Sequence, residues 1–369
     1  MAEPKIMHLA DNRTEEQHVY VQTKDGRFKY EVFMDYCKGL PEELAMMPVN
    51  GNVAGGFCDH EDNLYLILRG GGVGLAPGPR GCFVKLDPDG NYVRKIGEGI
   101  LGNGDDIHFG KVTPENTILI TTFRQQQILE MDMDGKVLME IGKKGEHNHN
   151  KPYNPMLNPR YVRIHQGLFP TEPIHYKPYG MYEAYLNFET TQYSKQPFCN
   201  PNAVDVDSEG HIWALDGYGN YALYKFDRQG NLLDVYGGKG VWDYTTDTPG
   251  KFIIPHALKV DKNDHIWVCD REKDAIHVFD KEGNIVFYAS HNMAQPSGVN
   301  TDGEYVYVVG RGGYLTIFDL EFNLVGQLGY FNGNLRGHDI AADSKGNLYL
   351  FPTHANEEHQ VVALKRIRN

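Results

Sequence analysis

The stretch "IPHALKVDKNDHIWVCDREKDAIHVFDKEGNIVFYAS" (residues 254–290) decides the fold of this chain, because a second stretch repeats it. Residues 200–237, "NPNAVDVDSEGHIWALDGYGNYALYKFDRQGNLLDVYG", align with it almost without gaps. In both, short runs of alternating or β-branched residues are separated by Asp/Asn/Gly turns such as "DKND" and "DRQG". This pattern predicts four strands joined by hairpins in each unit.

Four further copies of the unit extend the repeat, at residues 53–70, 108–142, 295–329 and 337–367. Units of about four strands with a period of roughly 40–50 residues predict a radial array of blades, a β-propeller. The last unit lacks a strand, and the alternating segment "RFKYEVFMDY" (27–36) is expected to complete it. The sequence therefore predicts an all-β, six-bladed β-propeller whose ring is closed by an N-terminal strand, which removes exposed strand edges.

Composition and charge favour a single soluble domain over residues 1–369. The 41 glycines and 23 tyrosines suit a turn-rich all-β protein, and the net charge of −13 argues against nucleic acid or an anionic membrane as a partner. No apolar run reaches the ~18 residues of a membrane helix, and the first residues lack the pattern of a signal peptide. The five cysteines show no metal-type pairing, so we expect a cytoplasmic protein with reduced thiols.

One segment interrupts the repeat between the second and third units. Residues 144–197 form a Pro- and Tyr-rich insertion. Stretches of this length without repeat character are usually functional or disordered, and the aromatic content argues against disorder. Two interpretations stay open: a lid over one face of the ring, or a contact between copies of the chain in a homo-oligomer.

Three histidines occupy the same position in alternate units. They are His108 in "DIHFGKV", His256 in "IIPHALKVD" and His338 in "LRGHDIAAD", each at the start of the first strand. A single histidine at such a position is more often a hydrogen-bonded structural residue than a ligand. Three of them, spaced around one ring, predict a three-histidine metal site with an open coordination position.

Further polar residues are expected at the same mouth of the channel. Strands within a blade are antiparallel, so the end of the second strand lies at the same face as the start of the first. The residues at these ends are Arg69, Tyr218, Arg271 and Arg311. At the histidine position, the intervening units carry Gly55 (or a neighbour), Asn202 and Ser297. By contrast, His211 and His265 start the second strand and are expected to be structural residues at the opposite face.

These residues resemble the peptidyl-α-hydroxyglycine α-amidating lyase family, a group of six-bladed propellers within the NHL-repeat class. The likeness covers most of residues 50–350 outside the insertion. "VAGGFCDHEDNLYLILRG" is similar to the arginine-bearing first blade, and "IHFGKV", "FIIPHALKVDKNDHIWVCDRE" and "GHDIAAD" resemble the three histidine blades. "FCNPNAVDVDSEGHIWALDGYGN" looks like the tyrosine blade. The motifs "DGYGN" and "PHAL…DRE" are specific in combination and weak individually.

The resemblance implies ligands and roles for individual residues. It implies zinc bound by His108, His256 and His338. It also implies a structural calcium ion bound by the Asp339 carboxylate and by backbone carbonyls near Gly56 and Gly110. A carboxylate beside nitrogen ligands suits two different ions.

The same resemblance implies a catalytic base. Tyr218 would be the general base, Arg69 its electrostatic partner, and Arg271 a supporting residue. A free tyrosine titrates near ~10, and adjacent positive charge favours the phenolate. The implied reaction cleaves the C–N bond of a carbinolamide into an amide and an aldehyde such as glyoxylate.

The chain departs from the family near the expected pocket. Arg336 stands two residues before His338, where the family has an apolar methionine. If Arg336 points inward, together with Arg311, an anionic or polar small molecule is the expected substrate; the alternative is a solvated surface arginine. We therefore expect a metal-dependent lyase acting on a small α-hydroxylated compound. Two alternatives remain: a metal-dependent, lactonase-like hydrolase and a non-catalytic NHL module for protein binding.

Overall fold

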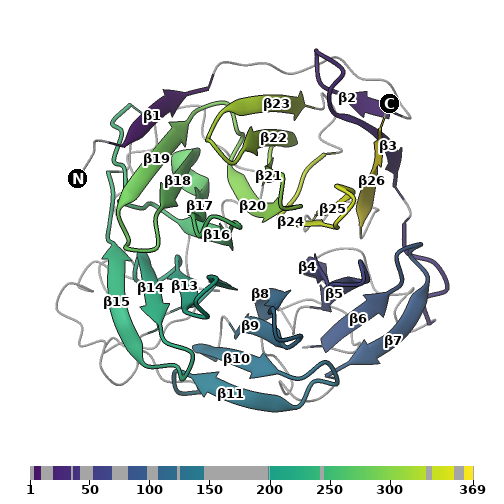
Figure 1. Ribbon diagram of the computed structural model, residues 1–369, viewed down its shortest axis with the longest axis horizontal. Helices are drawn as coiled ribbons and strands as arrows, with labels where there is room; N and C mark the ends of the chain where they lie inside the picture. Colours follow the sequence, from purple (N-terminus) through teal and green to yellow (C-terminus); the bar gives the residue numbers. More distant parts are fainter. Residues whose placement is uncertain are drawn as a thin grey trace, which may run out of the picture.

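The computed structural model describes a ring of six antiparallel β-sheets around a central channel (Figure 1). The described residues are 4–9, 20–34, 36–41, 53–68, 82–97, 107–122, 125–144, 198, 200–241, 245–329, 335–352 and 361–368. The predicted insertion at 144–197 falls outside them apart from Lys144, so its two interpretations stay predictions. Among the described residues, no helix is long and apolar enough to cross a membrane.

The first three blades follow one another along the chain, each with its first strand at the channel. Blade 1 comprises β4 (Val53–Cys58), β5 (Leu64–Leu68), β6 (Cys82–Leu86) and β7 (Tyr92–Ile96). Blade 2 comprises β8 (Ile107–Val112), β9 (Ile118–Thr122), β10 (Gln127–Met131) and β11 (Val137–Ile141). Blade 3 comprises β12 (Ala203–Val206), β13 (Ile212–Asp216), β14 (Ala222–Phe226) and β15 (Leu232–Gly237).

The other three blades complete the ring, and two of them recruit strands from the N-terminal part of the chain. Blade 4 comprises β16 (Pro255–Val260), β17 (Ile266–Asp270), β18 (Ala275–Phe279), β19 (Ile285–Ser290) and β1 (Lys5–His8). Blade 5 comprises β20 (Pro296–Thr301), β21 (Tyr305–Gly310), β22 (Tyr314–Asp319) and β23 (Leu324–Gly329). Blade 6 comprises β24 (Asp339–Ala342), β25 (Leu348–Phe351), β26 (Val362–Ile367), β3 (Lys29–Phe33) and β2 (Tyr20–Gln22).

Closure of the ring confirms the prediction made from residues 27–36. Strand β3 pairs antiparallel with β26, with Phe33 opposite Ala363 and Lys29 opposite Ile367. The last blade is therefore built from both ends of the described chain. In addition, β1 pairs in parallel with β19 at the outer edge of blade 4, which the sequence had not indicated.

A repeated carboxylate contact explains the "D…HIW" motif within the blades. The carboxylates of Asp207 and Asp261, in the turn after the first strand, accept hydrogen bonds from the indole N–H of Trp213 at 3.0 Å and Trp267 at 2.9 Å. Other blades place a tyrosine hydroxyl there, as in the pair Tyr65 and Asp59 at 3.1 Å. In these blades the contact ties the turn to the second strand.

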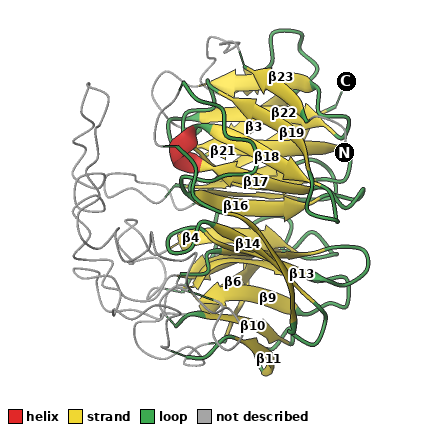
Figure 2. Cartoon of the chain, turned by 90° about the vertical axis from the view of Figure 1, so that its left-hand side faces the viewer, coloured by secondary structure: helices red, strands yellow, loops and turns green. Residues whose placement is uncertain are grey.

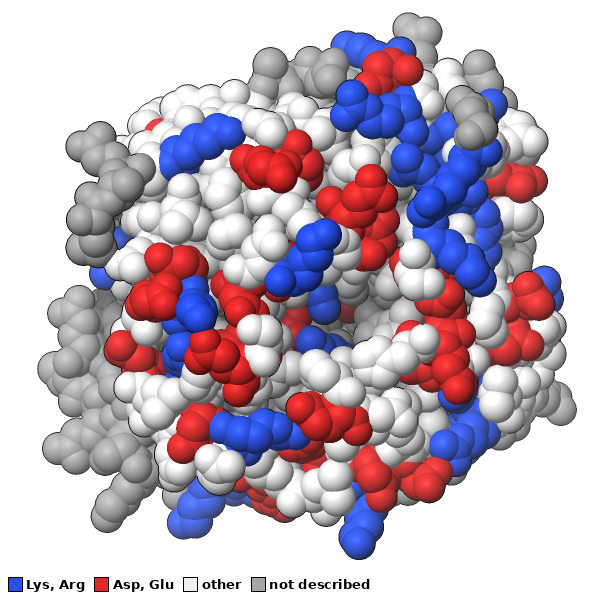
Figure 3. Space-filling model, in the orientation of Figure 1, with Lys and Arg blue, Asp and Glu red and all other residues white. Residues whose placement is uncertain are grey.

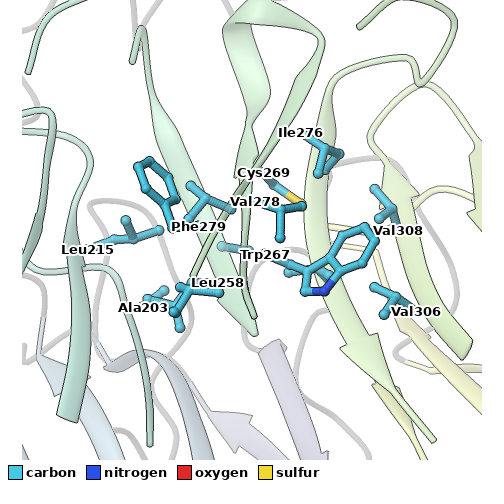
Figure 4. Packing of buried hydrophobic residues seen from close by; sticks show 14 of the residues in the cluster. Ala203, Leu215, Leu258, Trp267, Cys269, Ile276, Val278, Phe279, Val306 and Val308 are labelled. Carbon is cyan, nitrogen blue, oxygen red and sulfur yellow. The ribbon is translucent and has the colours of Figure 1, made fainter. Parts of the chain in front are cut away.

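Apolar side chains between neighbouring blades form the core. Figure 4 shows part of the largest cluster, in which Trp267 of blade 4 faces Val306 and Val308 of blade 5. Second strands such as β13 and β17 are buried along their whole length, whereas the outer strand β11 alternates between partly buried and exposed residues before its buried last residue. Buried packing on both sheet faces makes the ring a rigid support for residues at the channel.

The two faces of the disc differ in what they present. Seen edge-on, the short 3₁₀ helix η3 (Arg271–Lys273) lies at one face (Figure 2). The histidine position at the start of each first strand belongs to this face. The turns that follow the first strands, including Asp59–Asp62 and Asp343–Ser344, belong to the opposite face, together with the end of β26.

Candidate metal centre

The three predicted histidines meet at the channel axis. His108, His256 and His338 are all buried, and one ring nitrogen from each lies within 4.8 Å of those of the other two. Their ring centroids are separated by 4.7–5.1 Å. The alternation that the repeat predicted therefore produces a compact cluster of three imidazoles.

Each imidazole is oriented by a backbone carbonyl of the next blade. The Nδ1 atoms of His108, His256 and His338 lie 2.8, 2.6 and 2.7 Å from the carbonyl oxygens of Asn202, Ser297 and Ala54, respectively. A carbonyl oxygen accepts but cannot donate, so each Nδ1 carries the proton. In the neutral imidazole this leaves the Nε2 lone pair available, which is the tautomer that a metal ligand needs.

The accepting residues occupy the histidine position of the blades in between. Asn202 and Ser297 are the residues predicted there, and in blade 1 the equivalent residue is Ala54, the neighbour of Gly55. The ring of six first-strand positions thus alternates between an imidazole and the carbonyl that orients it. This threefold pattern is what a three-histidine site requires from a six-bladed frame.

The chemistry of this donor set fits a transition metal. The Nε2 atom of His256 is buried and has no hydrogen-bond partner among the described residues. Burial, together with the positive charges of Arg271 and the other two histidines, lowers the pKa of His256 well below its usual value. A neutral, buried imidazole with an unused lone pair beside two others is a nitrogen site suited to zinc.

Tyr218 and Arg271 lie beside this cluster, as the sequence predicted. The Arg271 Nη1 atom donates a hydrogen bond to the Tyr218 hydroxyl at 3.0 Å, and the guanidinium lies 5.5 Å from the centre of the tyrosine ring. The Tyr218 oxygen is 3.5 Å from His108 Nε2. A phenol oxygen between a guanidinium and the metal position is placed so that its anionic form is stabilised.

The buried Glu272 orients this arginine. Its Oε1 atom accepts a hydrogen bond from Arg271 Nε at 3.1 Å, while Oε2 lies 3.4 Å from the side-chain nitrogen of Gln295. The carboxylate therefore engages one edge of the guanidinium, and Nη1 is the atom directed to Tyr218. Glu272 belongs to the motif "DRE", and its role could not be predicted from that motif.

Asn202 connects the components of the site, a role that the sequence analysis missed. Its carbonyl accepts the His108 proton, and its Nδ2 atom donates to the carbonyls of Pro255 and His256 at 2.9 and 2.7 Å. Its Oδ1 atom accepts the N–H of Gly217, next to Tyr218, at 2.7 Å. A side chain at Gly217 would collide with the Pro255 carbonyl, so glycine is required at this crossing.

The expected calcium ligands line a cavity beneath the histidines. Gly56, Gly110 and Asp339 all contribute to a cavity of about 370 Å³ that extends toward the opposite face of the ring. Asp339 accepts the Gly56 N–H at 3.2 Å, and burial raises the pKa of its carboxyl group to about 8. A buried carboxyl group of this kind, with backbone around it, fits a hard cation that would favour its charged form.

The remaining predicted residues are placed less centrally or are not described. Arg69 lies outside the described residues. Arg311 follows β21 and donates its backbone N–H to the Gln295 carbonyl, and the Arg336 side chain is exposed. His211 and His265 each donate a hydrogen bond from Nδ1 to the carboxylates of Asp207 and Asp261, which agrees with their structural role in turns.

Comparisons with known proteins relate the chain distantly to NHL repeat proteins and amidating lyases. No family model matches the chain. Human NHL repeat-containing protein 3 is 32% identical over 118 residues, 30% of this chain and 32% of that protein. A probable peptidyl-alpha-hydroxyglycine alpha-amidating lyase of Caenorhabditis elegans is 34% identical over 83 residues, 22% of this chain and 23% of that protein. Peptidyl-glycine alpha-amidating monooxygenase A of Xenopus laevis is 29% identical over 181 residues, 44% of this chain and 19% of that protein.

The chain thus spans a third or less of the length of these relatives, and its homology to amidating lyases and NHL repeat proteins is distant. Among solved structures, a gluconolactonase of Xanthomonas campestris matches 92% of this chain and 90% of its own, with a TM-score of 0.53 and 12% identity. A streptogramin B lyase matches 92% of this chain and 98% of its own, with a TM-score of 0.52 and 10% identity. At such identity the two structures show a shared propeller fold.

Proposed function

We propose that the protein is a metal-dependent lyase that cleaves the C–N bond of a small carbinolamide. The observation that carries this proposal is the meeting of three carbonyl-oriented histidines with the Tyr218–Arg271 pair at one mouth of the channel. The distant homology to amidating lyases supports the same reaction class. The products would be an amide and an aldehyde such as glyoxylate.

The metal would be held by the Nε2 atoms of His108, His256 and His338. When bound, it supplies positive charge that polarises the oxygen of a ligand in the open position. The carbonyls of Asn202, Ser297 and Ala54 keep the rings turned for this purpose. A calcium ion at Asp339, Gly56 and Gly110 would be structural.

Tyr218 would move the proton. Its phenolate oxygen, stabilised by the Arg271 guanidinium, takes the proton from the carbinol hydroxyl. The electrons of that O–H bond form the C=O bond of the aldehyde while the C–N bond breaks. The Tyr218 hydroxyl then returns this proton to the amide nitrogen, which regenerates the phenolate, so the reaction needs neither water nor an oxidant.

The arginines at this face would bind the substrate's negative end. Arg311 follows β21 and Arg336 precedes His338, and we assign both to an anionic or polar group of a small substrate. Arg69 would support the phenolate together with Arg271. Arginines near this mouth of the channel suit a small anionic or polar metabolite in the cytoplasm better than a peptide end.

The proposal is tested by supplying N-acyl-α-hydroxyglycine compounds to the purified protein with zinc and measuring glyoxylate. Release of glyoxylate that depends on Tyr218 supports the lyase. Turnover of simple lactones without glyoxylate release would instead establish the hydrolase. A protein that binds no metal stoichiometrically and turns over neither class would be a binding module.

A further inference from the structure

The cavity at the face opposite the histidines contains a second arrangement of charged residues. Figure 3 shows the ring hollowed at its centre from this side, with basic side chains visible in the hollow. The cavity of about 370 Å³ is lined by residues of the first strands and of the turns that follow them. The ring of Phe109 contacts His256 and His338 at 5.3 and 5.2 Å between centroids, so it separates this cavity from the histidine cluster.

Two lysines in this cavity share one buried carboxylate. Lys111 of β8 and Lys259 of β16 lie three residues after His108 and His256, and Asp205 of β12 lies between them in blade 3. Lys111 Nζ contacts Asp205 Oδ1, and Lys259 Nζ lies 3.2 Å from Oδ2. The Asp205 side chain is only 2% exposed, and those of Lys111 and Lys259 are 16% and 19% exposed.

Both oxygens of the Asp205 carboxylate are engaged by donors, whereas the two lysine ammonium groups have N–H donors to spare. Its Oδ1 atom also accepts the Val206 N–H at 2.6 Å, and Oδ2 accepts the Val260 N–H at 2.9 Å. With the hydrogen bond from Lys111 and the ion pair with Lys259, both oxygens of this carboxylate are engaged. Each ammonium has three N–H donors, so the pair retains donors and one unit of excess positive charge that face the cavity.

We propose that this cavity binds a small monocarboxylate, with its carboxylate between Lys111 and Lys259. One negative charge neutralises the excess of the Lys–Asp–Lys group and uses the remaining donors in charge-assisted hydrogen bonds. Asp59, Asp62, Asp339 and Asp343 line the same cavity and disfavour anions of higher charge. Phe57 and Val299 offer apolar surface to a short carbon chain. The site is separate from the histidine cluster and from the proposed lyase reaction, and it shares its cavity with the carboxyl group of Asp339.

Binding is tested by titrating the full chain with carbon-13-labelled acetate and following its NMR linewidth. Acetate should bind saturably and acetamide should not. Lys111→Met and Lys259→Met should each weaken binding about tenfold or more, the usual effect of losing a hydrogen bond between charged groups. Asp205→Asn should tighten binding, because it raises the excess charge of the group.

Two control variants distinguish acetate binding at Lys111 and Lys259 from binding at another lysine or at the histidine cluster. Lys85→Met removes a lysine that pairs with Asp59 on the same cavity, at 3.2 Å, and should leave acetate binding unchanged. His256→Ala removes the metal cluster and should also retain acetate binding, which excludes acetate bound to the metal. Circular dichroism identifies a variant that has not folded, and Asp205→Asn then tests the proposal from the opposite direction.

Three outcomes would overturn the proposal. They are absence of saturable acetate binding by the wild-type chain, binding that Lys111→Met and Lys259→Met do not change, and weaker binding by a folded Asp205→Asn variant. Tighter binding of inorganic phosphate than of acetate would overturn the assignment to a monocarboxylate.

Discussion

Two kinds of blade alternate around the ring: those with a histidine at the channel and those between them. Both share one fold, but they contribute different groups to the site. Blades 2, 4 and 6 supply the imidazoles, whereas blades 3, 5 and 1 supply the carbonyls that orient them. The intervening blades also supply Tyr218 and the clamping side chains of Asn202 and Ser297. Residues of the blades that carry no histidine at this position therefore fix the tautomer and direction of the three imidazoles.

The largest effect is expected when one of the three histidines is removed. His256→Ala leaves two imidazoles, so bound zinc should fall from one per chain to background, and activity should be lost with it. Metal analysis after gel filtration measures this. The control is His265→Ala in the same blade, whose ring contacts Asp261 at a turn, and which should keep its metal. Full metal content in His256→Ala would show that the cluster is not the metal site.

Removing the phenol oxygen tests whether an intervening blade contributes the chemistry. Tyr218→Phe should lower kcat by about 10²–10⁴-fold, the range for loss of a general base, while metal content stays at one per chain. Steady-state glyoxylate release measures the change. Tyr236→Phe, at the outer strand of the same blade, should keep full activity. Intact turnover in Tyr218→Phe would contradict the assigned base.

Removing the Asn202 side chain tests whether the blades without a histidine influence metal binding through the histidines. Asn202→Ala should weaken zinc binding by about 10–100-fold, as is usual for residues that orient ligands. The reason is that its side chain joins the His256 backbone to the Tyr218 turn, although its carbonyl remains for His108. Competition with a zinc chelator measures the affinity. Unchanged affinity would restrict Asn202 to a structural role.

The smallest effect is expected at Ser297. A substitution there tests whether blades 3 and 5 contribute equally to holding the histidines. Ser297 Oγ donates a single hydrogen bond to the Gly337 carbonyl, at 2.6 Å, just before His338. Ser297→Ala should therefore cost about 0.5–1.5 kcal/mol in the free energy of unfolding and less zinc affinity than Asn202→Ala. Urea unfolding and the same chelator competition measure both. A larger loss of affinity than in Asn202→Ala would reverse the ranking of the two clamps.

Much of the fold and the metal cluster could be predicted from the sequence, because both follow from a repeat. The register of His108, His256 and His338 within their units fixed their height in the ring, and alternate blades fixed their spacing. The closing strand at 27–36 could be predicted from its alternation and from the missing strand of the last unit. The pairing of β1 with β19 could not, since four residues carry too weak a pattern.

The positions of Lys111 and Lys259 could not be predicted from the alternation of side chains along a regular strand. Lys111 stands three residues after His108, which on a regular strand places the two side chains on opposite faces. The pairing of β8 with β9 shifts between Ile107 and Gly110, and that of β16 with β17 shifts between Pro255 and Ala257. Such a bulge re-aims side chains, so histidine and lysine both face the channel. Bulges and contacts between blades depend on packing that one sequence does not reveal.

The sixth blade combines strands from both ends of the described chain, and this affects the order of folding during synthesis. Strand β3 leaves the ribosome early and must wait for β26, which is among the last described segments to emerge. His338 belongs to that same late blade, so a nascent chain holds only two of the three imidazoles. With the three histidines as the proposed metal ligands, metal acquisition is therefore expected to follow ring closure, and a truncated translation product should not take up zinc.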